Sequence, residues 1–168
     1  RVAYMSGGNT VRLAVCSDQS CSSFESDHVV DVRPGVSLTP NGLVLRSGDL
    51  PTIATRVPEP NSNLRVATCS DTSCSVPATV STPIFVQAGF LAVAVRSNDL
   101  PVIAFSSGGL NVASCSDIQC NSVSNSLLVD GPGPGGAAGQ YPSIALGVDG
   151  FPVATHLNTF NGELRYVR

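Results

Sequence analysis

The chain of 168 residues carries little charge and contains no lysine. Charged residues make up 12% of it, about half the usual quarter for a globular protein, and all nine cations are arginines. Without an amine side chain, Schiff-base and lysine-nucleophile chemistry are excluded. A net charge of −3 and the lack of any basic run make a nucleic-acid partner unexpected.

The sequence also lacks tryptophan, long apolar runs and helical periodicity. No apolar stretch approaches the length of about 18 residues that spans a bilayer, so we expect no membrane partner. The hydrophobic share of 42% is ordinary, and 16 glycines with 12 prolines make the chain turn often. These values predict one folded domain over residues 1–168.

What the sequence does contain is a repeat. Three segments end in Cys-Ser-Asp and align with one another: 11–18, 64–71 and 110–117. A second repeated block surrounds Pro51, Pro101 and Pro152, which follow one another after 50 and 51 residues. A period of this length is typical of propellers and solenoids.

Each period predicts four short strands. The first is represented by residues 43–46, and an Asp/Gly/Asn turn leads to a second strand that opens with proline. The third strand ends in cysteine, and the fourth is represented by residues 29–32. The predicted fold is therefore all-β, with blades of four antiparallel strands. Its units are a partial blade over 1–35, blades over 36–82 and 83–130, and a partial blade over 138–168.

The ends of the chain fall inside blades. Residues 1–4 align with 102–105, so we expect the chain to begin at a second strand and to end on a third, with fourteen strands in all. An incomplete ring leaves exposed strand edges. We therefore expect two copies to close the ring as a homodimer, with terminal strands exchanged or abutted. The alternative is a four-bladed monomer with two three-stranded blades.

The blade motif resembles a known family. Residues 143–152 read Ser-Ile-Ala-Leu-x-x-Asp-Gly-x-Pro, and residues 164–166 read Leu-Arg-Tyr. This pattern resembles the blades of secreted bacterial β-propellers of the sialidase-like and lactonase-like sort. The resemblance implies a propeller architecture, which serves lectins, hydrolases and scaffolds alike. The sequence departs from the family in having no tryptophan, no Trp-Asp dipeptide and no complete Asp-box.

Six cysteines form three equally spaced pairs that bracket predicted hairpin loops: Cys16 with Cys21, Cys69 with Cys74, and Cys115 with Cys120. Residues that flank such a loop lie within disulfide range, which favours three disulfides over the alternative of a zinc site. Disulfides indicate an oxidising compartment, so we expect a secreted or periplasmic protein. The aspartates that follow the first cysteines are interpreted as turn formers, with calcium ligation as the alternative.

Candidate catalytic residues are sought where the repeats differ. Met5, Arg56, Ser106 and His156 align if one deletion is allowed after Pro152. His156 is the candidate general base, with Arg56 and Ser106 as further catalytic candidates, unless it is a strand histidine bonded to a neighbour.

Metal and ligand sites are predicted from the same blades. Asp149, Asp99 and His156 are candidate ligands for a divalent metal, Ca²⁺ or Zn²⁺, by resemblance to propeller lactonases and phosphotriesterases. Arg46 and Arg96 follow first strands and would suit an anionic ligand, or else they cover the apolar edge of the blade.

Two further groups of side chains repeat or vary along the blades. Arg12, Arg65 and Arg165 repeat across blades and are expected to be solvated. Phe151 is among five aromatic residues that could offer a stacking surface, with a place in the core as the alternative.

These observations leave three functional hypotheses. The first is a self-assembling binding module for glycans or surface polymers, for which repetition supplies avidity. The second is a metal-dependent hydrolase of activated esters or phosphotriesters with its site in the central tunnel. The third is a fragment of a longer propeller without a function of its own.

Overall fold

The computed structural model describes residues 1–33, 39–57, 63–84, 88–132 and 138–168. Within these ranges the chain is all-β and forms fourteen strands and no α-helix, as the sequence predicts. The predicted boundary between residues 35 and 36 lies outside the described residues. The described part of the chain contains no helix with the length and apolar character of a membrane span.

The strands form four antiparallel sheets, each a meander in chain order. The first sheet contains β1 (Val2–Ser6), β2 (Thr10–Cys16) and β3 (Phe24–Val32). The second contains β4 (Thr39–Arg46), β5 (Leu50–Val57), β6 (Asn63–Thr68) and β7 (Thr79–Ile84), with the short 3-10 turn Ser47–Asp49 between β4 and β5. The third contains β8 (Leu91–Val95), β9 (Pro101–Ser106), β10 (Leu110–Cys115) and β11 (Val123–Asp130). The fourth contains β12 (Gln140–Leu146), β13 (Pro152–Asn158) and β14 (Glu163–Val167).

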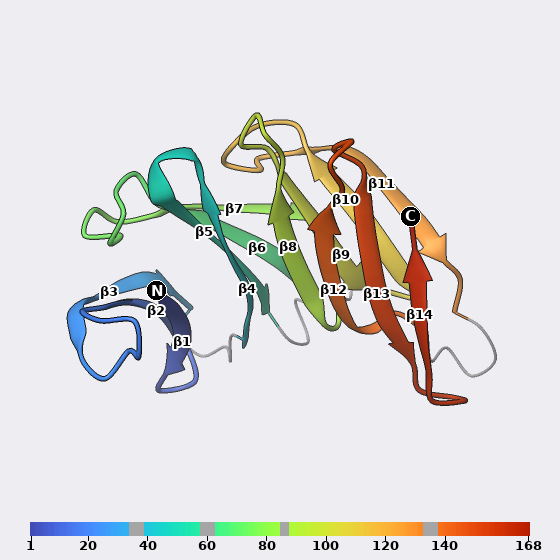
Figure 1. Cartoon of the computed structure of the whole chain (residues 1–168), viewed down its shortest axis with the longest axis horizontal. Helices are drawn as coiled ribbons and strands as arrows, with labels where there is room; N and C mark the ends of the chain where they lie inside the picture. Colours follow the sequence, from blue (N-terminus) through green and yellow to red (C-terminus); the bar gives the residue numbers. More distant parts are fainter. Residues whose placement is uncertain (34–38, 58–62, 85–87, 133–137) are drawn as a thin grey trace.

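The grouping of three, four, four and three strands agrees with the sequence prediction that the chain starts at a second strand and ends on a third. The four sheets follow one another in space in chain order, with β1–β3 at one end and β12–β14 at the other (Figure 1). The first strands β4, β8 and β12 lie side by side. The arrangement is blade-like, and ring closure by a second copy stays a prediction.

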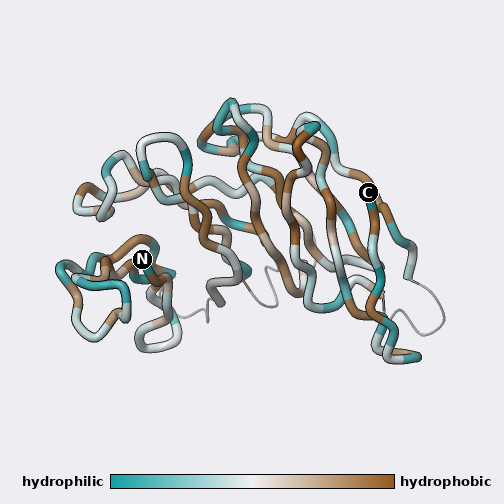
Figure 2. Tube along the Cα trace, viewed as in Figure 1, coloured by the Kyte–Doolittle hydropathy of each residue, from teal (hydrophilic) through white to brown (hydrophobic). Residues whose placement is uncertain are grey.

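The core lies between the sheets rather than at one centre. The strands β5, β6 and β9 of the inner sheets are buried on both faces, so successive residues point to opposite neighbours. In the second sheet, Ile53 and Ala67 pack towards the first sheet, whereas Ala54 and Val66 pack towards the third. Hydrophobic residues therefore run along the strands, while most hydrophilic ones lie in the turns (Figure 2).

All three predicted disulfides are present at the tips of the hairpins. Their Cα–Cα distances are 4.8, 5.2 and 4.9 Å in chain order. The carboxylate of Asp71 accepts hydrogen bonds from the backbone N–H groups of Ser73, Ser75 and Val76, and these bonds hold the pKa of Asp71 well below its usual range. The aspartate after the first cysteine thus organises the loop, as its interpretation as a turn former predicts.

Ion pairs connect consecutive sheets. Arg65 of β6 donates two hydrogen bonds to Asp31 of β3, at 2.8 and 2.7 Å. Arg165 of β14 bonds Asp130 of β11 in the same way, with one bond of 3.0 Å. The expectation of a solvated arginine is therefore wrong for Arg65, whose side chain is 13% exposed, whereas the side chain of Arg165 is 34% exposed.

Candidate functional site

A groove lies between the third and fourth sheets. It has a volume of about 430 Å³, and side chains from β10, β11, β13 and β14 form most of its walls. Val112, Leu127 and Val167 provide apolar surface there. Arg96, Asn125 and further polar groups lie along the same groove.

The groove is open because the fourth sheet has three strands. At the second junction the following sheet covers the outer strand of the sheet before it: Ser81 of β7, which occupies the same register position as Leu127 of β11, is 8% exposed. At the third junction β14 is the last strand of its sheet, and Leu127 of β11 remains 54% exposed. A partly apolar wall thus faces a space wide enough for a small ligand.

Two predicted candidates meet in this groove. Arg96, predicted to bind an anion, lines the groove and donates a hydrogen bond to Ser114 Oγ at 3.0 Å. Phe151, predicted to offer a stacking surface, lines it as well and is 64% exposed. Arg168 brings a second guanidinium, which pairs with Asp149.

Arg46, the other residue predicted to bind an anionic ligand, has a different environment. Its side chain is buried and donates to Thr52 Oγ1 at 2.9 Å and to the carbonyl oxygen of Cys69 at 2.6 Å. Burial lowers the pKa of its guanidinium. Arg46 therefore braces the second sheet and does not share the groove with Arg96.

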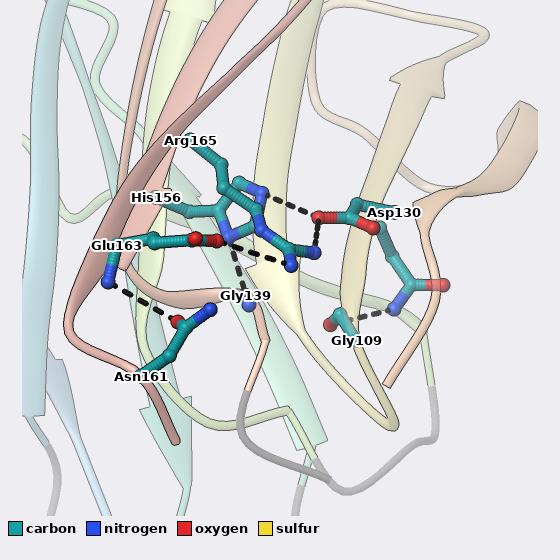
Figure 3. A network of polar contacts seen from close by, with 8 residues as sticks. Gly109, Asp130, Gly139, His156, Asn161, Glu163 and Arg165 are labelled. Carbon is teal, nitrogen blue, oxygen red and sulfur yellow. Dashed lines mark hydrogen bonds and ion pairs between the residues drawn. The ribbon is translucent and has the colours of Figure 1, made fainter. Parts of the chain in front are cut away.

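His156 occupies a buried polar cluster (Figure 3). The N–H of Gly139 donates to Nδ1 at 2.9 Å, so this nitrogen carries no proton. Nε2 lies 3.1 Å from Asp130 Oδ2, but its N–H is not directed at this oxygen and finds no hydrogen-bond partner in the described part of the chain. Arg165 contacts the same carboxylate oxygen, so the cluster ties the fourth sheet to β11.

The strand register corrects the alignment that singled out His156. Met5, Arg56 and Ser106 pair with Val11, Leu64 and Leu110, which are equivalent residues of the third strands. His156 instead pairs with Arg165, one position further along. A shift of one residue turns a side chain to the opposite face of the sheet.

The three predicted catalytic residues do not form one site. His156 is 0% exposed, so no substrate reaches its ring. Arg56 lies on β5 of another sheet. Ser106 is buried on β9 and lines a small separate cavity of about 190 Å³. Among the interactions of the described residues, none joins these three side chains.

The predicted metal ligands are likewise held apart by other partners. Asp99 Oδ1 accepts a hydrogen bond of 2.8 Å from the backbone of Ser47. Asp149 pairs with Arg168, while His156 lies in its own cluster. Across residues 1–33, 39–57, 63–84, 88–132 and 138–168, no group of three or more His, Cys, Asp or Glu side chains could hold a metal ion.

Several residues of the site were missed by reasoning from sequence. Asp130 was not singled out, although Asp31 occupies the matching position of β3 opposite the third strand. An arginine recurs on the third strands, and a recurring cation on a largely buried strand indicates an acidic partner. This signal could have identified Asp31 and Asp130. Asn125 and Leu127 have no motif of their own, but the partial blade predicted over 138–168 was a signal that the preceding strand would stay exposed.

Comparisons with known proteins give little further information. No family model matches the chain, and no curated protein sequence matches it. The chain is similar to the crystal structure of a protein of unknown function from Bacteroides caccae, with 11% sequence identity and a TM-score of 0.38. The match covers 99% of this chain and 71% of that one. A likeness of this size assigns neither a fold family nor a function.

Proposed function

We propose that the chain is a secreted β-propeller binding module that holds an acidic glycan in the groove between its third and fourth sheets. The four sheets would be the blades of this propeller. The observation that carries the proposal is the presence of Arg96, Asn125 and Phe151 in one open groove. The three disulfides are compatible with an oxidising compartment outside the cytoplasm.

The groove offers the groups that an acidic sugar needs. A guanidinium binds a carboxylate with two parallel hydrogen bonds, and both Arg96 and Arg168 line the groove. The exposed ring of Phe151 offers an apolar face for the C–H groups of a sugar, and the amide of Asn125 can bond a hydroxyl group. The volume of about 430 Å³ is in the usual range of small-ligand sites.

Hydrolysis is the weaker proposal. A general base must come within hydrogen-bond reach of its substrate, and His156 is fully buried. A metal-assisted reaction needs ligands that converge, whereas Asp99, Asp149 and His156 have separate partners. Ligand binding without a reaction does not require these residues to form a common site.

The test is calorimetric titration with an oligomer of galacturonic acid and with its methyl ester, which has the same shape but no charge. We expect the acid to bind and the ester to bind at least about tenfold more weakly, because the carboxylate partner of the arginines is lost. Phe151→Ala should weaken binding by about tenfold as well. Phe24→Ala removes a ring of similar exposure, 56% against 64%, from the first sheet and serves as the matched control.

Equal binding of the acid and the ester would contradict the proposal, as would an equal effect of the two phenylalanine variants. Binding lost on Phe151→Ala but kept with Arg96→Gln would leave stacking without charge recognition, and this also contradicts an acidic ligand.

A further inference from the structure

Every junction between sheets uses the same two faces. We call front face the side of a sheet that packs on the preceding sheet, and back face the side that receives the following one. In the second sheet the front face carries Ala67 and the Cys69–Cys74 hairpin, which pack on Val11 and Leu13 of the first sheet. The third sheet repeats this contact, with its hairpin Cys115–Cys120 against the back face of the second sheet.

In the part of the chain that the structure describes, the back face of the fourth sheet is largely exposed. Leu64 and Val66 lie on the back face of the second sheet and are both 0% exposed. The strand register makes Leu164 and Tyr166 their equivalents in β14. These two side chains are 76% and 64% exposed. A large apolar surface is thus open at one end of the molecule.

Part of the front face of the first sheet is exposed as well. Its hairpin Cys16–Cys21 is half-buried, although the cysteines of the two later hairpins are at most 2% exposed. Val2 and Val29 are 42% and 43% exposed. The two open faces therefore belong to the two sides of one recurring contact, and their sheets lie at opposite ends of the row (Figure 1).

The charges on the front faces fit this contact. Arg65 on the second sheet finds its acid, Asp31, on the preceding sheet. Its equivalent Arg12 bonds Asp27 of its own sheet, and Asp27 also accepts a hydrogen bond from Tyr4. The first sheet thus carries the counter-ion of its own arginine, and the described part of the fourth sheet has no fourth strand that could supply one.

We propose that the back face of the fourth sheet binds the front face of the first sheet of a second copy, head to tail. The Cys16–Cys21 hairpin then covers Leu164 and Tyr166, as the later hairpins cover the sheets before them. Two copies offer two such junctions, so a dimer satisfies both open faces. This inference goes beyond the proposed glycan site and does not rest on it, because the groove lies on the opposite side of the fourth sheet.

The experiment uses two variants of the full chain, Leu164→Arg and Val29→Arg, in analytical ultracentrifugation. We expect the unaltered chain to be a dimer and each variant to associate about thirtyfold more weakly, because an exposed apolar side chain of the junction is replaced by a charge. An equal mixture of the two variants should form dimers again, since one of its two junctions then contains no substitution. Val148→Arg changes a fully exposed turn residue of the fourth sheet and serves as the matched control.

Three results would overturn the proposal. An unaltered chain that stays monomeric shows that something other than a second copy covers these faces. A dimer that persists in Val29→Arg shows that copies meet through like faces. A mixture that fails to associate, while circular dichroism finds both variants folded, excludes the head-to-tail arrangement.

Discussion

The ion pair between Arg65 and Asp31 gives the sharpest prediction about stability. Replacing Asp31 by isoleucine leaves the guanidinium at the first junction without its acid. Isoleucine is the natural residue at the matching position of the second sheet, where Ile84 pairs with Leu64 as Asp31 pairs with Val11. The substitution therefore suits the shape of the junction and tests its charge.

The magnitude follows from the geometry of the pair. Both hydrogen bonds are short, at 2.8 and 2.7 Å, and the two side chains are 13% and 4% exposed. Removing one partner of a buried pair costs about 3–5 kcal/mol. The guanidinium of Arg65 keeps a little contact with water, so we expect the lower end, about 3 kcal/mol, or a change of about 150-fold in the unfolding equilibrium.

The assay is urea denaturation followed by circular dichroism, without reductant and at one protein concentration. The double variant Asp31→Ile, Arg65→Met should return to within about 1 kcal/mol of the unaltered chain, because no charge is then left unpaired. Glu163→Ala removes an exposed partner of Arg165, 3.4 Å away, and should change the free energy of unfolding by less than about 0.5 kcal/mol.

The reasoning fails if Asp31→Ile alone stays within about 0.5 kcal/mol of the unaltered chain. It also fails if the double variant is no more stable than the single one, because the loss would then come from packing and not from the stranded charge.

Two further predictions concern a glycine and an acid. Gly139→Ala should lower the free energy of unfolding by more than about 2 kcal/mol in thermal denaturation, because φ is +83° and a Cβ would meet the backbone of Gly109 at 2.5 Å. Gly108→Ala is the control, since its φ is +58° but the space around it is open, and it should lower this free energy by about half as much. Equal losses in the two variants would refute the steric explanation. The hydrogen bond from Tyr4 and the neighbouring guanidinium lower the pKa of Asp27, so its contribution to stability is complete above the unfolded-state pKa of about 3.9 and is lost as the pH falls through the folded-state pKa. Tyr4→Phe should therefore move the midpoint of acid unfolding to higher pH, and an unchanged midpoint in a titration followed by circular dichroism would contradict this.

The fold was largely predictable because its signals are local and repeated. Prolines at the start of second strands and cysteine pairs at hairpin tips mark the same places in each period, and the strands and disulfides follow from them. Even so, one looser repeat misled the alignment. An alignment that allows one deletion after Pro152 places His156 on the wrong face of its strand, because the register shows no such deletion.

The candidate site was less predictable, because it depends on contacts between sheets. Arg46 and Arg96 follow equivalent strands, yet one is buried against Thr52 and the other lines an open groove. The neighbouring sheet differs, and so does the second strand, because Thr52 accepts a hydrogen bond from Arg46 whereas the equivalent Val102 cannot. Asp130 escaped notice for the same reason, since its partner Arg165 lies 35 positions away on the next sheet.

The chemistry of the junctions also bears on how the chain reaches its folded state. Similar repeats in one chain can dock in the wrong order during folding. The first and third junctions each pair an arginine with an aspartate. At the second junction, Ile84 of the second sheet and Phe105 of the third belong to one apolar cluster instead. If the third sheet docked on the first, Asp31 would be buried without a cation, and a misordered stack would carry that cost. The alternation of charged and apolar junctions therefore disfavours docking of the third sheet on the first.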